Sequence, residues 1–322
     1  MNRLIGFIVI MMIAPFLTGC TGPETQRVEN SPESPAQTIA EAAEVKETFE
    51  PPQNEATDNN FDTSREISIV SREDGSGTRG AFIELFGILE KGDGGSETDT
   101  TSEEAIIVNM TDVMMTNIAN DDYAIGYVSL GSLNDSVKAL DIDGVAATSE
   151  NVKTGTYKVA RPFNIATKGE VRGLAKDFID FILSSEGQRI ISGDYIAVND
   201  AAPAYAGTRQ SGKIVVAGSS SVTPIMEVLK EGYLLLNPEA TIEIQMTDSS
   251  AGMAAVIDGV CDIGMASREL KESELTELTP IQIAIDGIAV IVNNNNVATG
   301  MASDEIKEIF TGAASTWGDI IN

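Results

Sequence analysis

From residue 65 onwards the chain alternates short apolar runs with longer segments of mixed polarity, which is the pattern of strands followed by helices. Apolar runs with the length of buried strands occupy residues 67–70, 123–128, 213–217 and 241–246. Segments with helical spacing or helix-end signals occupy residues 81–89, 111–120, 173–183, 223–236 and 251–258. Strands that alternate with helices predict an α/β fold.

Three of the strand-to-helix junctions are turns rich in serine, glycine and threonine, at residues 71–79, 218–221 and 247–250. The first N–H groups of a helix have no backbone partner and lie at the positive end of the helix dipole, so such a turn can bind an oxyanion. Helix capping alone also explains each turn. Three turns of this kind in one chain favour a site where several helix N-termini converge on one ligand.

The junction at residues 71–79 contains the most candidate ligand groups. Gly77 lets the backbone approach a ligand closely, and Ser76 and Thr78 add hydroxyl donors. Arg72 can supply a planar, permanently charged donor. The alternative is a capped helix start with a solvent-facing arginine.

The first 20 residues predict a lipoprotein signal peptide. A basic start at Arg3 precedes an apolar run over residues 4–16 that is too short to span a membrane. The sequence Leu-Thr-Gly-Cys then ends at Cys20 and resembles a bacterial lipobox, whose cysteine becomes the lipid-modified first residue of the mature chain. We therefore expect an extracytoplasmic protein anchored to the cell membrane through Cys20, with an uncleaved anchor as the alternative.

Residues 21–64 are rich in Glu, Pro, Thr, Ser and Asn and contain few aromatic residues, valines or isoleucines. Such a segment cannot bury enough apolar surface to offset the entropy that it would lose on ordering. We expect a disordered acidic linker between the membrane anchor and the folded part, with a docking role as the alternative.

Composition excludes several classes of function. The chain has no histidine, which excludes Ser-His-Asp and Cys-His catalysis and imidazole metal sites. A formal net charge of −28 argues against nucleic acid as a partner. Cys261 has no disulfide partner once Cys20 is acylated, so we expect a buried thiol. Residues 141–144 match a calcium loop only in part and predict a hairpin turn, so we expect neither a metal nor a cofactor.

The junction sequences together resemble the phosphate-binding protein of bacterial ABC-type phosphate uptake. The resemblance rests on Gly-Ser-Ser-Ser-Val-Thr-Pro at residues 218–224, Asp-Ser-Ser-Ala-Gly at 248–252, Asp-Ile-Gly-Met-Ala-Ser-Arg-Glu-Leu at 262–270 and Ser-Arg-Glu-Asp-Gly-Ser-Gly-Thr at 71–78. Supporting stretches lie at residues 178–184, 284–292 and 309–312 and at Trp317. The resemblance covers nearly all of residues 66–322.

The resemblance implies a type II periplasmic-binding-protein-like fold, in which two α/β lobes joined by two crossing strands hold the ligand in the cleft between them. In ordinary members the segment resembling residues 213–322 comes first, so the order found here implies a circular permutation. The expected parts are a signal peptide at 1–20, a linker at 21–64, a discontinuous lobe at 65–157 plus 285–322, and a continuous lobe at 158–284. Residues 204–212 would join the ends that the family normally leaves free.

The resemblance also implies which residues bind the oxyanion: Arg72, Ser76, Gly77 and Thr78 from one lobe, and Ser220, Ser221, Ser249 and Ser267 from the other. It further implies that Asp74 orients Arg72 through a charge-assisted hydrogen bond. Some members carry an aspartate where Ser267 stands, which makes selectivity against sulfate less secure than oxyanion binding itself.

The function implied is a non-enzymatic lipoprotein monomer that captures inorganic phosphate and delivers it to ABC permease subunits. The alternatives are a phosphate sensor or surface lipoprotein without a permease, a phosphate-ester hydrolase, and a dimer whose chains exchange halves. The lack of histidine and the hydroxyl-rich site argue against the hydrolase.

Overall fold

The structure is a computed structural model that describes residues 61–92 and 96–321. These residues belong to one compact unit. The expected signal peptide, its Cys20 and the expected linker as far as residue 60 lie outside the described residues. The expected end of the linker at residue 64 is wrong, because Phe61 already packs against the rings of Tyr123 and Trp317. Within the described ranges, none of the helices has both the length and the apolar character needed to cross a bilayer.

Strands and helices alternate along the described chain, as the apolar pattern predicted. The strands are β1 (Ser68–Arg72), β2 (Leu89–Lys91), β3 (Glu97–Asp99), β4 (Ile106–Val108), β5 (Ala124–Ser129), β6 (Lys138–Ala139), β7 (Asp141–Ile142), β8 (Ala160–Lys168), β9 (Ile196–Ala197), β10 (Gly212–Ser219), β11 (Ala240–Thr247), β12 (Ile263–Ala266), β13 (Leu278–Val292) and β14 (Gly300–Met301). The helices are α1 (Gly77–Leu85), α2 (Thr111–Ala119), α3 (Ser149–Lys153), α4 (Gly173–Ile182), α5 (Ser185–Ile191), α6 (Thr223–Leu236), α7 (Ser249–Ile257), α8 (Glu272–Leu275), α9 (Ser303–Phe310) and α10 (Trp317–Ile320), with a 3-10 turn η1 (Leu130–Ser132).

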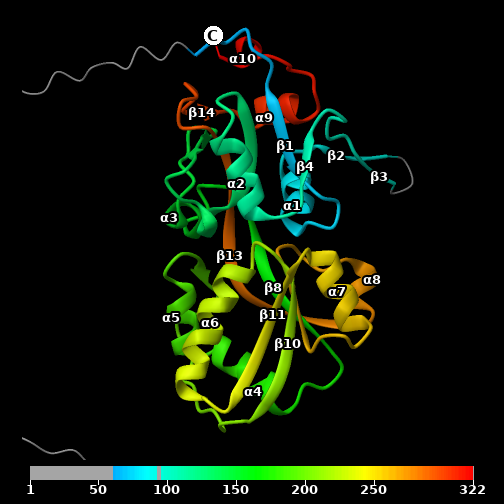
Figure 1. Ribbon diagram of the computed structural model, residues 1–322, viewed down its shortest axis with the longest axis vertical. Helices are drawn as coiled ribbons and strands as arrows, with labels where there is room; N and C mark the ends of the chain where they lie inside the picture. The colour runs from blue at the N-terminus through cyan, green and yellow to red at the C-terminus, as the bar shows by residue number, and fades with distance from the viewer. Residues whose placement is uncertain (1–60, 93–95, 322) are drawn as a thin grey trace, which may run out of the picture. The chain divides into compact units, whose positions relative to one another are not determined.

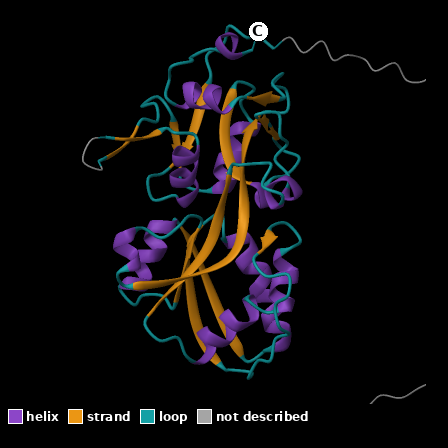
Figure 2. Ribbon diagram, turned by 180° about the vertical axis from the view of Figure 1, so that it is seen from behind, coloured by secondary structure: helices purple, strands orange, loops and turns teal. Residues whose placement is uncertain are grey.

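A ten-stranded sheet runs through the molecule in the order β11-β10-β12-β8-β13-β5-β1-β4, and β6 and β9 also pair with β13. At one end β10 is parallel to β11 and β12, and at the other β1 is parallel to β4 and β5. Between them β8 and β13 run antiparallel, from Leu278 opposite Lys168 to Gly287 opposite Ala160. These two long strands pass from one half of the molecule to the other (Figures 1 and 2).

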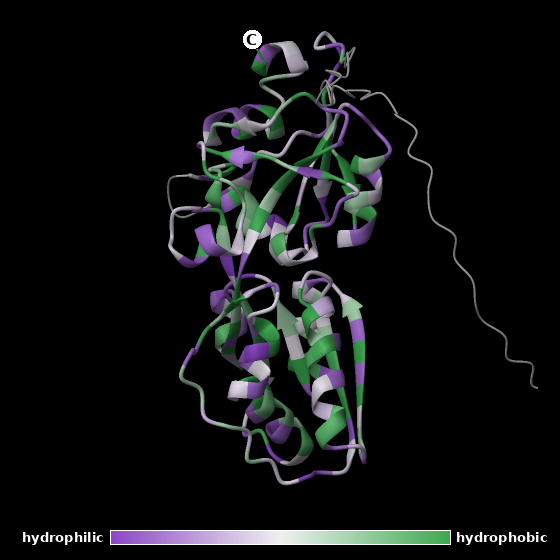
Figure 3. Cartoon of the chain, turned by 90° about the vertical axis from the view of Figure 1, so that its left-hand side faces the viewer, coloured by the Kyte–Doolittle hydropathy of each residue, from purple (hydrophilic) through white to green (hydrophobic). Residues whose placement is uncertain are grey.

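Each half has its own hydrophobic core, so the fold is the predicted α/β architecture of two lobes. We call the half with β1, β5 and α1 the first lobe, and the half with β10, β12 and α6 the second lobe (Figure 1). The main core of the first lobe draws its residues from 67–159, Ile196 and 288–317, and that of the second from 163–284. The central strands of both lobes are largely hydrophobic (Figure 3), because parallel strands covered by helices are buried on both faces.

The two ends of the described fold lie side by side in the first lobe. The Ile67 N–H donates to the Ser315 carbonyl at 2.9 Å, and the Trp317 N–H donates to the Arg65 carbonyl at 3.1 Å. Ile67, Phe310 and Trp317 share one hydrophobic core. This adjacency is what a permuted order of the two segments would require.

Two local predictions are confirmed. Residues 141–144 form a turn in which Asp143 and Gly144 have φ angles of 52° and 74°, and Ile142 pairs with Val145 across it. Cys261 is a buried free thiol, and burial raises its pKa to about 11. Such a thiol is protonated and unreactive at neutral pH.

Carboxylates of the second lobe hold the connector at residues 204–212, and one of them, Glu186 of α5, accepts from the Tyr205 N–H at 2.8 Å. Asp177 of α4 accepts hydrogen bonds from the hydroxyls of Tyr205 at 2.6 Å and Tyr233 at 2.7 Å, and from the Thr208 N–H at 3.1 Å. These bonds attach an otherwise irregular segment to the helices of the second lobe.

Candidate functional site

Arg72, the last residue of β1, lies at the junction of the two lobes and is only 3% exposed. Its N–H donates to the Tyr127 hydroxyl at 3.1 Å, and the Tyr127 ring stacks on Phe82 with centroids 3.9 Å apart. Burial raises the pKa of Tyr127, which keeps this hydroxyl neutral. The Glu73 carboxylate accepts from Arg72 Nε at 2.9 Å and Nη2 at 2.8 Å, and this two-point contact orients the guanidinium plane.

The turn after Arg72 leads into α1. The Ser76 hydroxyl is the N-cap of this helix and accepts from the Arg79 N–H at 3.3 Å. Gly77 and Thr78 form the first turn of the helix, and both are buried. The polar start of α1 therefore faces inward.

In the second lobe, the last residues of β10 include a position that requires glycine. Gly218 has a φ of 137°, and a Cβ at this position would lie 2.3 Å from the Met265 carbonyl oxygen. The turn presents Ser219, Ser220 and Ser221, all buried, just before α6. The predicted strand–turn–helix junction is therefore present.

Two further serines lie beside this turn. Ser249 is the first residue of α7, which is capped by Asp248, and Ser267 follows β12. The Ser267 N–H donates to Ser249 Oγ at 3.1 Å, and Ser219 Oγ donates to Ser267 Oγ at 3.0 Å. All of these serines are buried, so the turns after β10, β11 and β12 meet in one polar cluster.

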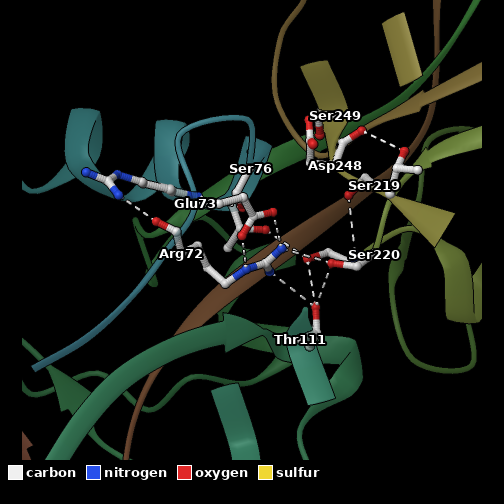
Figure 4. A network of polar contacts seen from close by, with 12 residues as sticks. Arg72, Glu73, Ser76, Thr111, Ser219, Ser220, Asp248 and Ser249 are labelled. Carbon is white, nitrogen blue, oxygen red and sulfur yellow. Dashed lines mark hydrogen bonds and ion pairs between the residues drawn. The ribbon is translucent and has the colours of Figure 1, made fainter. Parts of the chain in front are cut away.

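Side chains of the first lobe reach this cluster directly. Arg72 Nη2 donates to Ser220 Oγ at 3.0 Å, and Thr78 Oγ1 lies 2.8 Å from Ser221 Oγ and 3.3 Å from Ser267 Oγ. Figure 4 shows Arg72 extending toward Ser220 from the opposite lobe. The structure thus brings six of the predicted site residues into one hydrogen-bonded network: Arg72, Thr78, Ser220, Ser221, Ser249 and Ser267.

The remaining predicted site residues border the network. A Cβ on Gly77 would lie 2.5 Å from Ser249 Oγ, so Gly77 packs directly against the second lobe. Ser76 is buried at the edge of the network, where its hydroxyl caps α1. Beside Ser76 a cavity of about 620 Å³ opens between the lobes, with Arg161 and Arg268 among its lining residues.

The expectation for Asp74 is wrong. Its side chain is 97% exposed and pairs with Arg79 at 3.3 Å, whereas Glu73 holds Arg72. The physical reason is that Asp74 lies in the turn after β1, where its side chain faces solvent, while Glu73 lies next to the arginine at the strand end.

Sequence reasoning missed three buried residues of the site: Ser219, whose bond to Ser267 is described above, Thr111 and Arg161. Thr111 starts α2, and its hydroxyl lies 3.3 Å from Ser220 Oγ and 3.5 Å from Arg72 Nη1. Arg161 of β8 donates from Nη2 to Thr78 Oγ1 at 3.0 Å. A threonine at a helix start was a usable signal for Thr111, but no local pattern distinguishes Arg161 from any arginine in a strand.

Arg161 forms a buried ion pair with Asp286 of β13, with Nη1 and Oδ2 2.8 Å apart. Burial lowers the pKa of Arg161, and the Asp286 carboxylate opposes that change. Burial raises the pKa of Asp286, and the Arg161 guanidinium and a hydrogen bond from Ser129 oppose that rise. Each partner therefore opposes the effect that burial has on the pKa of the other.

The site as a whole is a cluster of hydrogen-bond donors. The starts of α1, α2, α6 and α7 contribute residues to it, and α2 and α6 have no side-chain cap. The carboxylates of Glu73 and Asp286 are engaged by arginines. Among the described residues there is no group of three or more Cys, Asp or Glu arranged to hold a metal. Hydroxyls, helix starts and guanidinium groups suit a buried oxyanion.

Comparison with known proteins agrees with this geometry. The model of the PBP superfamily domain matches residues 51–186 and 203–321. Phosphate-binding protein PstS 2 of Streptococcus agalactiae serotype V is 50% identical over 267 residues, which cover 82% of this chain and 91% of the relative. The PstS 2 protein of Streptococcus pneumoniae serotype 4 is 44% identical over 268 residues, covering 83% and 92%.

A crystal structure of a phosphate-binding protein of a phosphate ABC transporter from Streptococcus pneumoniae superposes with a TM-score of 0.64. It is 45% identical, and the match covers 80% of this chain and all of that one. Both the sequence and the fold are therefore shared over most of the described residues.

Proposed function

Because the chain belongs to the PBP superfamily and, within it, to the PstS phosphate-binding proteins, we propose that it binds inorganic phosphate between its lobes and delivers it to an ABC permease. The observation that carries this proposal is the 3.0 Å contact of Arg72 in the first lobe with Ser220 in the second, inside a buried cluster of donors. A phosphate inserted here would accept hydrogen bonds from both lobes and hold them closed.

The proposed ligand groups are those of the network and its border: Arg72, Ser76, Gly77, Thr78, Thr111, Ser220, Ser221, Ser249 and Ser267. Glu73 takes the supporting role in place of Asp74. The site supports binding rather than catalysis, because the chain has no histidine, the carboxylates of Glu73 and Asp286 are engaged by arginines, and that of Asp248 caps α7. No metal or cofactor is part of the proposal.

We further propose an extracytoplasmic monomer that is anchored to the membrane through a lipid on Cys20. Residues 21–60 would be the disordered linker that separates the fold from the membrane surface. The net charge of −28 would repel nucleic acid, so nucleic acid is not among the proposed partners.

For the architecture we propose a circular permutation, with a discontinuous lobe at 65–157 plus 285–322 and a continuous lobe at 158–284. The hydrogen bond between Ile67 and Ser315 supports this, because ends that lie together can be joined or opened without disturbing the core. The division of the two main cores between Val159 and Phe163, and again between Ala284 and Ile288, supports the lobe limits.

The test is a calorimetric titration of the purified protein, first freed of bound anion by unfolding and refolding, with phosphate and then with sulfate. We expect one phosphate per chain. Arg72→Ala should weaken binding about 100-fold, because it removes charge-assisted hydrogen bonds worth about 1.5–3 kcal/mol each. Arg172→Ala is the matched control, since Arg172 is 78% exposed. Absence of phosphate binding by the unmodified protein would overturn the proposal.

A further inference from the structure

One buried ion pair lies on the two strands that connect the lobes. Arg161 of β8 and Asp286 of β13 are opposite each other in the antiparallel register, and their side chains are 2% and 1% exposed. Removing two charges from water costs several kcal/mol per ion before their attraction offsets it. A buried ion pair of this kind is therefore weak evidence that the pair stabilises the fold. The other contacts of Arg161 and Asp286 point to a different role.

The Arg161 guanidinium contacts both lobes and the connecting strand. Nε donates to the Ser267 carbonyl of the second lobe at 3.0 Å, and Nη2 donates to Thr78 Oγ1 of the first lobe at 3.0 Å. Nη1 donates to Asp286 and, at 3.0 Å, to the Gly287 carbonyl on β13. One rigid planar group therefore spans the junction at which the lobes meet.

Asp286 holds this group in a single orientation. Its carboxylate also accepts from Ser129 Oγ at 2.7 Å and from the Gly131 N–H at 3.2 Å, both in the first lobe. With its acceptors occupied on three sides, the carboxylate cannot follow a rotation of the guanidinium. Nη2 of Arg161 is consequently aimed at Thr78.

The hydrogen bond from Arg161 to Thr78 determines where the proton of the Thr78 hydroxyl points. A guanidinium can only donate, so Thr78 Oγ1 must accept from Arg161 and its single proton must point elsewhere. The other oxygens within reach are Ser221 Oγ at 2.8 Å and Ser267 Oγ at 3.3 Å, which are themselves predicted ligand groups. In a complex, that proton is available to an oxyanion bound among these serines.

We propose that Arg161 is a positioning residue of the oxyanion site, which turns the Thr78 hydroxyl into a dedicated donor toward the ligand when the lobes close. This inference rests on the proposed function, because it takes a tetrahedral oxyanion such as phosphate as the ligand. It adds to that function a residue that acts through Thr78 from the connecting strands.

The test is a double-mutant cycle on phosphate affinity with Arg161→Lys and Thr78→Val, measured by calorimetry. Lysine keeps a positive charge beside Asp286 but lacks the fork that reaches Thr78. We expect each single variant to bind phosphate about tenfold more weakly, and the double variant no more weakly than about tenfold, because both changes remove the same donor. Thr78→Ser keeps the hydroxyl, so in that background Arg161→Lys should again weaken phosphate binding about tenfold.

Additive losses of about 100-fold in the double variant, or unchanged affinity in Arg161→Lys, would overturn the inference. Arg172→Lys, at an exposed site, is the matched control for the substitution itself. If the unmodified protein binds sulfate instead of phosphate, the proposed function fails and the same cycle with sulfate still decides the role of Arg161. If it binds neither anion, both proposals fail.

Discussion

Arg72 and Ser220 stand 148 positions apart in the chain and lie in different lobes, yet the Arg72 guanidinium donates to the Ser220 hydroxyl at 3.0 Å. Both residues are 3% exposed, so separating the lobes would expose groups that are now paired with each other. Thr111 lies within 3.5 Å of both, which adds a third element to the same contact. Residues that shape this contact should therefore control ligand affinity through lobe closure.

Glu73→Gln should weaken phosphate binding about tenfold, because it removes a charged partner that orients Arg72. Asp74→Asn is the matched control and should change affinity less than about twofold, since its side chain is 97% exposed. Calorimetric titration of both variants measures the difference. Equal losses in the two variants, or a larger loss in Asp74→Asn, would contradict the assignment of Glu73 as the support.

Gly77→Ala should prevent full closure, because the added Cβ would lie 2.5 Å from Ser249 Oγ and 2.8 Å from Ser267 Oγ. We expect phosphate affinity to fall at least about tenfold and the radius of gyration with phosphate, measured by small-angle X-ray scattering, to stay above that of the unmodified complex. Gly80→Ala lies in the same helix, and its Cβ would make only an ordinary van der Waals contact with Arg268 Cδ, at 3.8 Å. That variant should bind normally and gain up to about 1 kcal/mol of stability from helix propensity; normal closure of Gly77→Ala would refute the steric argument.

Asp177 should make the free energy of unfolding decrease as the solution becomes acidic. Burial alone would raise its pKa, but hydrogen bonds from Tyr205, Tyr233 and Thr208 outweigh it, so the pKa is lowered from 3.8. A carboxyl with a lowered pKa in the folded state stabilises the fold above its ordinary pKa, and that contribution is lost as the pH falls through the folded value.

Asp177→Asn should therefore cost about 2 kcal/mol at neutral pH, because it replaces the acceptor of several hydrogen bonds. The cost should shrink as the pH falls through the lowered pKa of the folded protein, because the carboxyl of the unmodified protein then becomes protonated. Urea unfolding at neutral pH and over a descending series of acidic pH values measures this, with Asp180→Asn as the exposed control on the same helix. A cost that does not change with pH would show that the charge of Asp177 does not matter.

Moving the chain ends should leave the site intact. A variant that begins at Gly212, and in which a short glycine–serine linker joins Ile320 to Phe61, restores the order that we regard as the usual one. Since Ile67 and Ser315 are already hydrogen bonded, we expect the same monomeric fold with phosphate affinity within about threefold. Size-exclusion chromatography and calorimetry test this; a misfolded or non-binding product would mean that residues 204–212 are more than a connector.

Local signals in the sequence predicted much of the fold. The helix expected at residues 223–236 coincides with α6, because Pro224 marks its first turn and Asn237 and Pro238 mark its end. The turn at residues 141–144 was also predicted from its local sequence. Such features depend on neighbours within a few positions, so the sequence carries them without a tertiary context.

Local signals did not predict which of Glu73 and Asp74 holds Arg72, nor did they predict the role of Arg161. Whether a carboxylate beside Arg72 meets the guanidinium depends on where β1 ends against Tyr127, and Arg161 meets Thr78 only because two lobes close on it. Sequence by itself determined the element order, the helix starts that can hold an oxyanion and the family. Only the tertiary structure decided which groups meet across the lobes, because Arg72 and Ser220, and Arg161 and Thr78, are more than 80 positions apart in the chain and no local pattern records their distances. It also decided between Glu73 and Asp74, because the packing of the end of β1 sets which of these neighbouring side chains reaches Arg72.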